Sequence, residues 1–491
     1  MLKLTRPFSV LTNHVVKNFY KGDWHESSEL IPINDLYSKN KLMHVSNSNN
    51  VFLGDCPNYG LHNPLKNVHR YQELGNVCFR IGALLDNKCV SDHLIKLIQL
   101  VCPKSYDQAS GEVNVTKNFF KNFSQDNPQY LAHGYFQPGD RTGQHSINYR
   151  FPYGRVAIIS PFNFPLEIPA LQMMGALLMG NRPLVHVDYK VSVVMEHFIN
   201  LMLDCGLCKD DFVFINGYGR NIEKHVLDYR PNMTLFTGST IISDHLSKLL
   251  NGKIKVEDGG FNWKIIDKNI DEKYFDMIAT TCDKDAYSFS GQKCSAQRLL
   301  FIHKNNYQPL VDIITEKALK RNVADKSIVP LLSVSKQQFI ERFIKLSQLS
   351  TLLFGREIDN STCMWSPTCF SMSCYSFIEN YDIVCQELFG PLQVIVQYDD
   401  DDIDNIIDTI NKIDNKLTCA IVSDNIQFQH KFLENTVNGT TYVGLRARTT
   451  GAPQNRWFGP GCDPRGGSLG TPEAIRQVWS YSRSITTDNI I

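Results

Sequence analysis

The segment Ser290-Gly-Gln-Lys-Cys-Ser-Ala296 places one thiol among small, turn-forming residues. Such a segment predicts a loop, from which the side chain of Cys294 could reach a ligand. A free thiol is only a few per cent thiolate at neutral pH, so it needs a general base or a local positive field to attack a carbonyl carbon. The alternative is that Cys294 is inert, as most single cysteines are.

Two polar residues upstream could supply what this thiol lacks. Glu257 follows the β-run 253–256, and a carboxylate at the carboxyl end of a strand lies where open α/β sheets hold their ligands. It could deprotonate the thiol and later a water molecule, or it could simply pair with a lysine. Asn163, in Ser160-Pro-Phe-Asn-Phe-Pro165, could bind a developing oxyanion together with the N–H of Cys294. The flanking prolines equally suit an Asx turn at Asn163.

Two further segments have the chemistry of a dinucleotide site. In Phe236-Thr-Gly-Ser-Thr240, Gly238 and Ser239 lie between a predicted strand and a predicted helix, so backbone N–H groups point at an anion. This turn is not the Gly-x-Gly-x-x-Gly fingerprint and is weak evidence by itself. In Gln386-Glu-Leu-Phe-Gly-Pro391, Glu387 could bind the hydroxyls of a ribose and Phe389 could pack against a nicotinamide ring. The alternative there is a capped turn.

Bulk composition limits the classes of partner. The chain of 491 residues is too long for one core, so two or three domains are expected. Fifty basic and fifty acidic residues cancel, so no global field favours nucleic acid or an anionic membrane, and a small molecule is the expected partner. No apolar run reaches the roughly 18 residues of a membrane span. A loose cysteine cluster lacks a nearby histidine pair, so we expect no metal site; its members are Cys363, Cys369, Cys374 and Cys385.

The elements that must position these residues alternate between strands and helices. From Gly154 to Glu257 the alternation is that of parallel βαβ units and predicts an α/β fold. The predicted strands are 155–159, 183–187, 212–215, 233–236 and 253–256, and the predicted helices are 166–179, 191–204, 220–229 and 240–250. Upstream, 71–126 should be mostly helical and 134–152 a β-hairpin.

The ordered set of these residues resembles the aldehyde dehydrogenase superfamily, from about Phe19 to the C terminus; the set is Asn163, Gly238, Glu257, Cys294 and Glu387. Finer features resemble the plant-type Δ1-pyrroline-5-carboxylate dehydrogenases within that superfamily. These features are residues 60–64, 161–169, 236–239, 290–297, 438–442, 448–455, 457–460 and 470–473.

The resemblance implies an aldehyde dehydrogenase fold with three parts. A Rossmann-like NAD-binding domain would comprise residues 19–133 and 153–256, and an α/β catalytic domain residues 257–443. A small β flap, residues 134–152 with 479–491, would join copies into a homodimer or a higher homo-oligomer. Residues 444–478 would form an anchor-loop region that packs back on both domains.

The resemblance also implies a reaction, the NAD-dependent oxidation of L-glutamate 5-semialdehyde to L-glutamate in proline catabolism. The semialdehyde forms from Δ1-pyrroline-5-carboxylate by ring opening. Cys294 would attack the aldehyde, Asn163 and the Cys294 N–H would hold the oxyanion, and Glu257 would direct water onto the thioester. The alternatives are an aldehyde dehydrogenase for another small aldehyde and a catalytically idle scaffold.

By the same resemblance, the cofactor contacts would be Ser160, Pro161, Phe162, His186, Gly238, Ser239, Glu387 and Phe389. The substrate contacts would be Ser295, Phe458, Gly467 and Ser468, with backbone N–H groups of the 465–468 turn binding the α-carboxylate. Ser295 could instead cap a helix. His186 stands where relatives usually carry a lysine, and Tyr189 where many carry a glutamate that selects against a 2′-phosphate, so NADP stays open as an alternative cofactor.

The N-terminal residues have the composition of a targeting segment. Lys3, Arg6, Lys17 and Lys21 precede the first acidic residue, Asp23, which is typical of a mitochondrial presequence. Residues 1–18 are therefore interpreted as a candidate targeting segment and the mitochondrial matrix as the location. The alternative is an ordinary N-terminal tail on a cytoplasmic protein.

Overall fold

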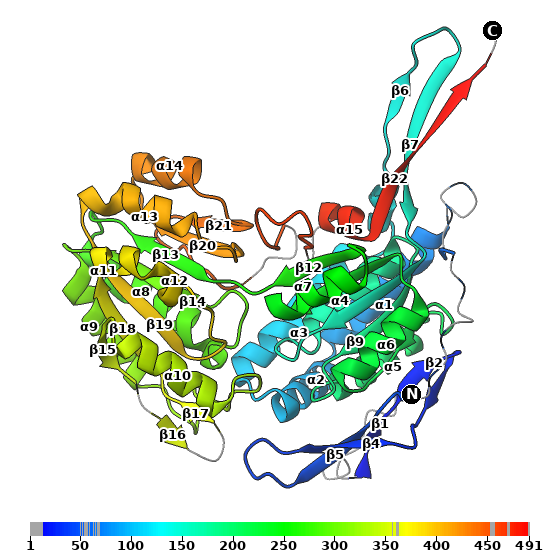
Figure 1. Ribbon diagram of the computed structural model, residues 1–491. Coiled ribbons are helices and arrows are strands. Elements are labelled where there is room, and N and C mark those ends of the chain that lie inside the picture. The colour runs from blue at the N-terminus through cyan, green and yellow to red at the C-terminus, as the bar shows by residue number, and fades with distance from the viewer. Residues whose placement is uncertain are drawn as a thin grey trace.

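Two seven-stranded sheets form the framework of the computed structural model (Figure 1). The first has the order β12-β11-β8-β9-β10-β2-β3 and the second β15-β18-β19-β14-β13-β20-β21. Helices cover both sheets, which confirms the predicted α/β class. The structure describes residues 13–49, 51, 53, 57, 59–61, 63, 65, 69–355, 357–359, 363–451, 457–468 and 472–489.

The first sheet contains all five strands predicted between residues 154 and 257. These strands run parallel, whereas β2 pairs antiparallel with β10 and with the edge strand β3. The bounds are β2 (Asn18–Tyr20), β3 (Asp23–His25), β8 (Arg155–Ser160), β9 (Arg182–Val187), β10 (Val213–Phe214), β11 (Met233–Gly238) and β12 (Ile254–Asp258). Parallel strands align their carboxyl ends, so the loops that follow β8, β9, β11 and β12 share one edge.

The helices of this half bury a large apolar core. The predicted crossover helices are present as α4 (Glu167–Leu178), α5 (Val193–Asp204), α6 (Gly219–Tyr229) and α7 (Thr240–Leu249). The predicted upstream helices are α1 (Arg70–Asp86), α2 (Lys88–Val101) and α3 (Tyr106–Asn122). Helix α4 is buried on almost every side, because it lies between the sheet, α3 and the C-terminal helix α15 (Pro472–Trp479). No helix in the described parts of the chain is long and apolar enough to cross a membrane.

The second sheet organises the other half of the molecule. Its strands are β13 (Asn262–Ile266), β14 (Gln297–His303), β15 (Thr351–Phe354), β18 (Thr368–Ser373), β19 (Leu392–Tyr398), β20 (Thr418–Val422) and β21 (Thr440–Val443). Its helices are α8 (Phe275–Tyr287), α9 (Tyr307–Leu319), α10 (Lys336–Ser347), α11 (Cys374–Glu379), α12 (Tyr381–Val384), α13 (Ile403–Ile410) and α14 (Ile426–Asn435). A two-stranded sheet of β16 (Glu357–Asp359) and β17 (Met364–Trp365) completes this half.

A three-stranded arm projects from the first half (Figure 1). It contains the predicted hairpin, β6 (Phe136–Pro138) and β7 (Gln144–Pro152), and β22 (Ser480–Asp488) pairs with β7 along nine residues. Tyr135 and Phe136 are 71% and 66% exposed. The role of this arm in assembly stays a prediction.

The described part of the N-terminal segment, from residue 13 on, belongs to the folded structure. A small sheet combines β1 (Val15–Val16), β5 (Lys41–Ser46) and β4 (Leu30–Asn34). Residues 13–18 of the candidate targeting segment are thus part of the folded chain, and Asn18 is 1% exposed. Residues 1–12 lie outside the described residues.

A buried ion pair fixes the C-terminal segment to the second half. Lys264 Nζ lies 2.7 Å from Asp285 Oδ2, and both side chains are almost fully buried. The Asp285 carboxylate also accepts hydrogen bonds from the backbone N–H of Thr449 and from the N–H and hydroxyl of Thr450. The Asp285 carboxylate therefore joins three segments of the chain, namely β13, α8 and residues 449–450.

We predict that Asp285→Ala lowers the free energy of unfolding by about 3–5 kcal/mol, because it leaves the Lys264 ammonium buried without a counter-charge. Urea unfolding followed by circular dichroism measures the loss. Asp276→Ala is the matched control, since its partner Lys317 binds an Asp276 side chain that is 79% exposed; its loss should be much smaller. Equal losses in the two variants would contradict a structural role for the buried pair.

Candidate active site

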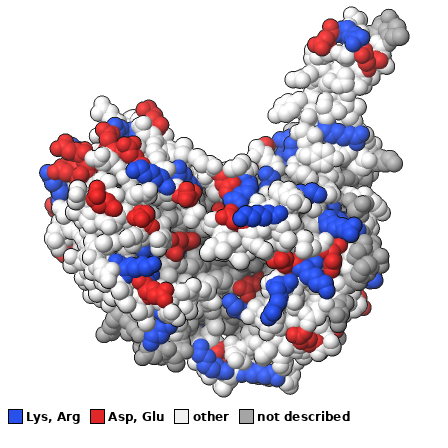
Figure 2. Space-filling view, viewed as in Figure 1, with Lys and Arg blue, Asp and Glu red and all other residues white. Residues whose placement is uncertain are grey.

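The predicted site residues of the first half meet at one edge of its sheet. In the parallel register, Gly238 of β11 pairs with Asp258 of β12, next to Glu257. On the other side, Ser160 of β8 is aligned with Val187 of β9, next to His186. The register alone therefore brings these residues to the same end of neighbouring strands. The surface is hollowed where the two halves of the molecule meet (Figure 2).

The second half contributes the loop that carries Cys294. This loop connects a short 3-10 turn, Ser288–Gly291, to β14, and Gly291 has a φ of 66°. A Cβ on Gly291 would lie 2.2 Å from the carbonyl oxygen of Gly390, so only glycine fits. Arg298 donates hydrogen bonds to the carbonyls of both glycines, at 2.7 and 2.6 Å. The predicted thiol loop is thus present and is fixed to the loop that bears Glu387.

The thiol of Cys294 lies against the carboxylate of Glu257. The distance from Cys294 Sγ to Glu257 Oε1 is 3.9 Å, with the thiol as donor. Glu257 is 2% exposed, and its Oε2 has no hydrogen-bond partner among the described residues. Cys294 itself is only partly buried. A base and a nucleophile are therefore adjacent, at a position that a substrate can reach.

Burial raises the pKa of both Glu257 and Cys294. It raises the pKa of Glu257 to about 8, and the neighbouring carboxylate of Glu167 adds to that rise. Burial also raises the pKa of Cys294, and the negative charges of Glu257 and Glu387 raise it further. A thiol in this environment keeps its proton unless a base next to it takes that proton, which is what the geometry offers.

Asn163 lies beside the same loop. It is 3% exposed, and its Nδ2 donates to the carbonyl of Gln292 at 3.3 Å. A primary amide carries two hydrogens on this nitrogen, so one remains for an oxyanion near Cys294. Thiol, carboxylate and amide come from segments far apart in the sequence, and the fold brings all three together.

An aromatic contact between the two halves accompanies these groups. The rings of Phe162 and Phe389 meet edge to face with centroids 6.0 Å apart. Ser160 and Pro161 precede Phe162, and the Ser160 hydroxyl donates to Gln172 Oε1 at 3.4 Å. This apolar contact beside polar strand ends suits the flat ring and ribose of a dinucleotide.

Glu387 approaches the backbone that follows β12. Gly260 N donates to Glu387 Oε1 at 3.5 Å, and a Cβ on Gly259 would lie 2.3 Å from Glu387 Oε2. Burial raises the pKa of Glu387 to about 7, with Arg298 acting in the opposite direction. The glycines therefore leave room for a carboxylate close to the backbone that follows β12.

His186 lies buried at the end of β9. Its Nδ1 lies 3.1 Å from the carbonyl of Ile215, which fixes that nitrogen as a donor. Burial lowers the pKa of His186, so the ring is neutral at physiological pH. Tyr189, two residues beyond β9, packs edge to face on Tyr218. This corner offers hydrogen bonds without a formal positive charge on His186.

Gly238 is the last residue of β11 and Ser239 is the N-cap of α7, so the strand–turn–helix arrangement is as predicted. A Cβ on Gly238 would lie 2.5 Å from the ring of Phe236, which excludes larger residues. The Ser239 side chain makes no capping hydrogen bond to α7. The helix start therefore keeps backbone donors that a phosphate could use.

The predicted substrate contacts are divided between two places. Ser295 follows Cys294 directly and is 6% exposed. The 465–468 turn pairs with the middle of β12, where Gly467 N donates to the Val256 carbonyl at 2.8 Å. Ser468 Oγ accepts from the backbone N–H of the buried Phe458 at 2.8 Å. The turn thus lies beside Glu257, but the Gly467 N–H is already engaged by the sheet.

Glu167 is a site residue that the sequence analysis missed. It begins α4, four residues after Asn163, and its carboxylate is close enough to Glu257 and Lys293 to shift the pKa of each. Burial raises its own pKa to about 8, and Glu112 adds to the rise. The signal in the sequence was a lone charge in the apolar stretch 164–171.

These features define a thiol-based dehydrogenase site on a two-sheet α/β fold. The model of the aldehyde dehydrogenase family matches residues 70–462. The chain therefore belongs to the aldehyde dehydrogenase family, whose members use NAD or NADP.

Two named relatives are similar to this chain over most of its length. A probable aldehyde dehydrogenase from Linum usitatissimum is 43% identical, over 96% of this chain and 89% of that protein. Delta-1-pyrroline-5-carboxylate dehydrogenase 12A1, mitochondrial, from Arabidopsis thaliana is 42% identical, over 96% of this chain and 88% of that protein. Among solved structures, a 1-pyrroline-5-carboxylate dehydrogenase variant from Thermus thermophilus superposes with a TM-score of 0.82 at 18% identity, covering 97% of this chain and 93% of that one.

We predict that Cys294→Ala abolishes aldehyde oxidation while leaving the fold intact, because it removes the thiol that lies 3.9 Å from Glu257 Oε1. Steady-state formation of NADH or NADPH measures the activity. Cys462→Ala is the matched control, since Cys462 is an exposed cysteine, and it should retain normal turnover. Residual activity of Cys294→Ala comparable to the control would refute a covalent route.

We also predict an ascending pH profile. The ionised form of Glu257, which acts as the base, fills as the pH rises through its pKa of about 8. Turnover limited by thioester hydrolysis should therefore increase roughly tenfold between about pH 7 and 9. Glu257→Gln should be slow and pH-independent over this range, and a variant that keeps the wild-type profile would assign the rise to another group.

Proposed function

We propose that this protein oxidises L-glutamate 5-semialdehyde to L-glutamate with NAD, as the second step of proline catabolism. The observation that carries the proposal is the convergence of Cys294, Glu257 and Asn163 in a chain 42% identical to a named Δ1-pyrroline-5-carboxylate dehydrogenase. The name of that relative also supports a mitochondrial location, and the exposed arm supports a homo-oligomer.

The chemistry begins at the thiol. Glu257 Oε1 accepts the Cys294 proton, and the sulfur attacks the aldehyde carbon of the substrate. The carbonyl oxygen becomes an alkoxide that accepts hydrogen bonds from Asn163 Nδ2 and the Cys294 N–H. A bound oxidised nicotinamide would supply the acceptor for the hydride of this carbon, and loss of that hydride would re-form the carbonyl as a thioester on Cys294.

The second half of the cycle uses the same base. Glu257 releases its first proton to solvent and then takes a proton from a water molecule, whose oxygen attacks the thioester carbon. The carbon–sulfur bond breaks, L-glutamate leaves, and the thiol is restored. Per turnover, one aldehyde, one water and one NAD⁺ give one carboxylate, one NADH and two protons.

The proposed cofactor residues fit a dinucleotide. The uncapped start of α7 at Gly238 and Ser239 would receive a phosphate, and Glu387 would receive ribose hydroxyls. Phe162 and Phe389 would border the nicotinamide. Because His186 is neutral, it supplies no counter-charge for a 2′-phosphate, which favours NAD over NADP.

The substrate carries a carboxylate and an ammonium at the end away from the aldehyde. Ser295, Ser468 and the 465–468 turn would bind the carboxylate, with Phe458 packing on the carbon chain. The Gly467 N–H would contribute only if the turn shifts away from the Val256 carbonyl that it now binds. Glu167 would bind the ammonium, since its partly exposed carboxylate lies beside the catalytic carboxylate Glu257.

We predict that Glu167→Gln raises KM for the semialdehyde by roughly 10- to 100-fold, the usual worth of a hydrogen bond to a charged group. KM for glutaraldehyde, which lacks the ammonium and the α-carboxylate, should change little. Steady-state kinetics with both aldehydes measure the split. Glu341→Gln, an exposed position on α10, is the control for loss of charge.

The substrate assignment has its own test in the wild-type protein. The ratio kcat/KM should be highest for the semialdehyde and much lower for glutaraldehyde and succinic semialdehyde. Equal ratios for all three aldehydes would reject the proposed substrate while leaving aldehyde oxidation intact.

A further inference from the structure

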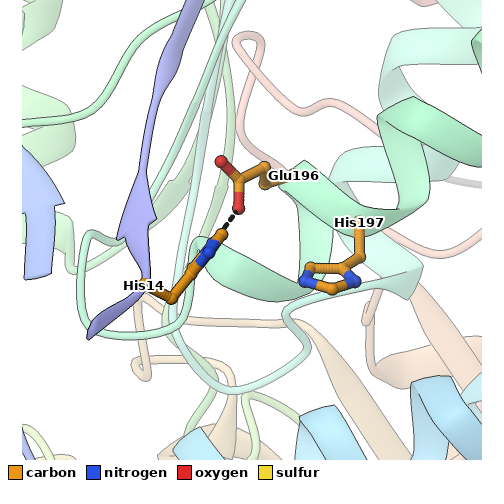
Figure 3. Close-up of side chains that lie close together, drawn as sticks. All are labelled: His14, Glu196 and His197. Atoms are coloured by element: carbon orange, nitrogen blue, oxygen red, sulfur yellow. Dashed lines mark hydrogen bonds and ion pairs between the residues drawn. The ribbon is translucent and has the colours of Figure 1, made fainter. Parts of the chain in front are cut away.

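Three imidazoles and one carboxylate gather on the first half of the molecule, where the chain enters the small N-terminal sheet. His14 directly precedes β1, His93 lies in α2, and Glu196 and His197 are neighbours in α5. Figure 3 shows the His14 ring directed at the Glu196 carboxylate, with the His197 ring beside them. None of these residues takes part in the proposed dehydrogenase chemistry.

The carboxylate at the centre of this group is well ordered by its contacts. Glu196 Oε2 lies 2.6 Å from His14 Nε2, and Glu196 Oε1 accepts the backbone N–H of Lys17 at 2.8 Å. The Glu196 side chain is 6% exposed and that of His14 is 21% exposed. The group is thus rigid on the helix side and open to solvent at His14.

The donor atoms are close enough to share one ion. One ligand atom from each of His14, Glu196 and His197 lies within 4.8 Å of the other two. Ligand atoms around tetrahedral zinc are about 3.3–3.5 Å apart, as bond lengths near 2.0–2.1 Å require. Side-chain rotations alone could close the difference.

We propose that His14, Glu196 and His197 bind one divalent transition-metal ion of the zinc type. Two imidazole nitrogens and one carboxylate oxygen are a ligand set that suits such ions, with water completing the coordination. The ion would displace the proton shared by His14 and Glu196, so that two metal–ligand bonds replace one hydrogen bond.

His93 supports this set from behind. Its Nε2 lies 3.0 Å from His197 Nδ1, and the two rings are 5.1 Å apart. The Nε2 atom of His93 can accept the Nδ1 proton of His197 and so orient that ring, as outer partners of metal-binding histidines commonly do.

Other clusters in the described residues lack this arrangement. His303, Asp399 and Asp400 also lie close together, but Lys304 and Lys268 already pair with the two aspartates. The Cys-x-x-Cys spacing 205–208 joins one buried and one exposed cysteine. The expectation of no metal site rested on cysteines, whereas His14 and Glu196 are 182 positions apart and have no local signature.

The proposed ion would act as a clamp. It would join the segment before β1 to α5 and so fix the N-terminal sheet on the helices of the first half (Figure 1). This role is structural and separate from turnover at Cys294.

The test measures metal binding directly. The full chain with Cys294→Ala, which removes a competing thiol, is stripped with a chelator and titrated with Co²⁺ and Zn²⁺. We expect one equivalent per chain, and an X-ray absorption spectrum of the Co²⁺ form with nitrogen and oxygen neighbours only. His14→Ala and His197→Ala should each weaken binding at least roughly tenfold. His245→Ala is the control, because His245 forms an exposed pair with Glu223, and it should bind normally.

Glu196→Gln separates metal binding from folding. The glutamine keeps an acceptor for the Lys17 N–H but lacks the anionic ligand, so it should also weaken binding while circular dichroism shows a native fold. In the background without Cys294→Ala, dehydrogenase activity of the His197→Ala variant should be unchanged. Binding below one equivalent, sulfur neighbours, or unaltered affinity in the His14, Glu196 and His197 variants would overturn the proposal.

Discussion

The site depends on the burial of one carboxylate, that of Glu257, next to one thiol, that of Cys294. In solvent, a glutamate carboxylate is too weak a base to take a proton from a thiol or from water. At the end of β12, burial and the charge of Glu167 raise the pKa of Glu257 to about 8, which makes it a useful base near neutral pH. The same burial raises the pKa of Cys294. The two groups, 3.9 Å apart, are therefore useful only as a pair.

The fold holds Glu257 and Cys294 together because the edges of the two sheets that carry these residues face each other. The first sheet supplies Glu257 and Asn163 through the parallel register of β8, β11 and β12. The second supplies Cys294 through a loop that requires glycine at Gly291 and is tied by Arg298 to the loop of Glu387. The pair is consequently sensitive to any shift of one half against the other, because neither half contains both groups.

Local sequence patterns were sufficient to predict the five parallel strands, which are β-branched runs. Glu257, Asn163 and Gly238 could be predicted as site residues because each lies at or just after the carboxyl end of one of these runs. Long-range packing accounts for what was missed. The raised pKa of Glu167 depends on burial by distant segments and on the charge of Glu112 in α3. The engagement of Gly467 depends on its pairing with β12, and the His14 cluster depends on contacts across the first half. Of these residues, only Glu167 has a local sign in the sequence, as a lone charge in an apolar stretch; the partners on which each contact depends are distant in the chain.

The central claim is that Cys294 carries the substrate as a thioester that Glu257 hydrolyses. The most direct measurement is the intact mass of Glu257→Gln after mixing with the semialdehyde and NAD. Without Glu257 the thiol loses its proton only to solvent, so the account predicts that acylation is slowed and that hydrolysis of the thioester is slowed more. A covalent adduct with the mass of the acyl group should therefore accumulate on Cys294 over a long incubation, accompanied by about one equivalent of NADH per chain, and no adduct should form when Cys294 is also replaced by alanine. Normal turnover with no adduct, or an adduct that survives the loss of Cys294, would contradict it.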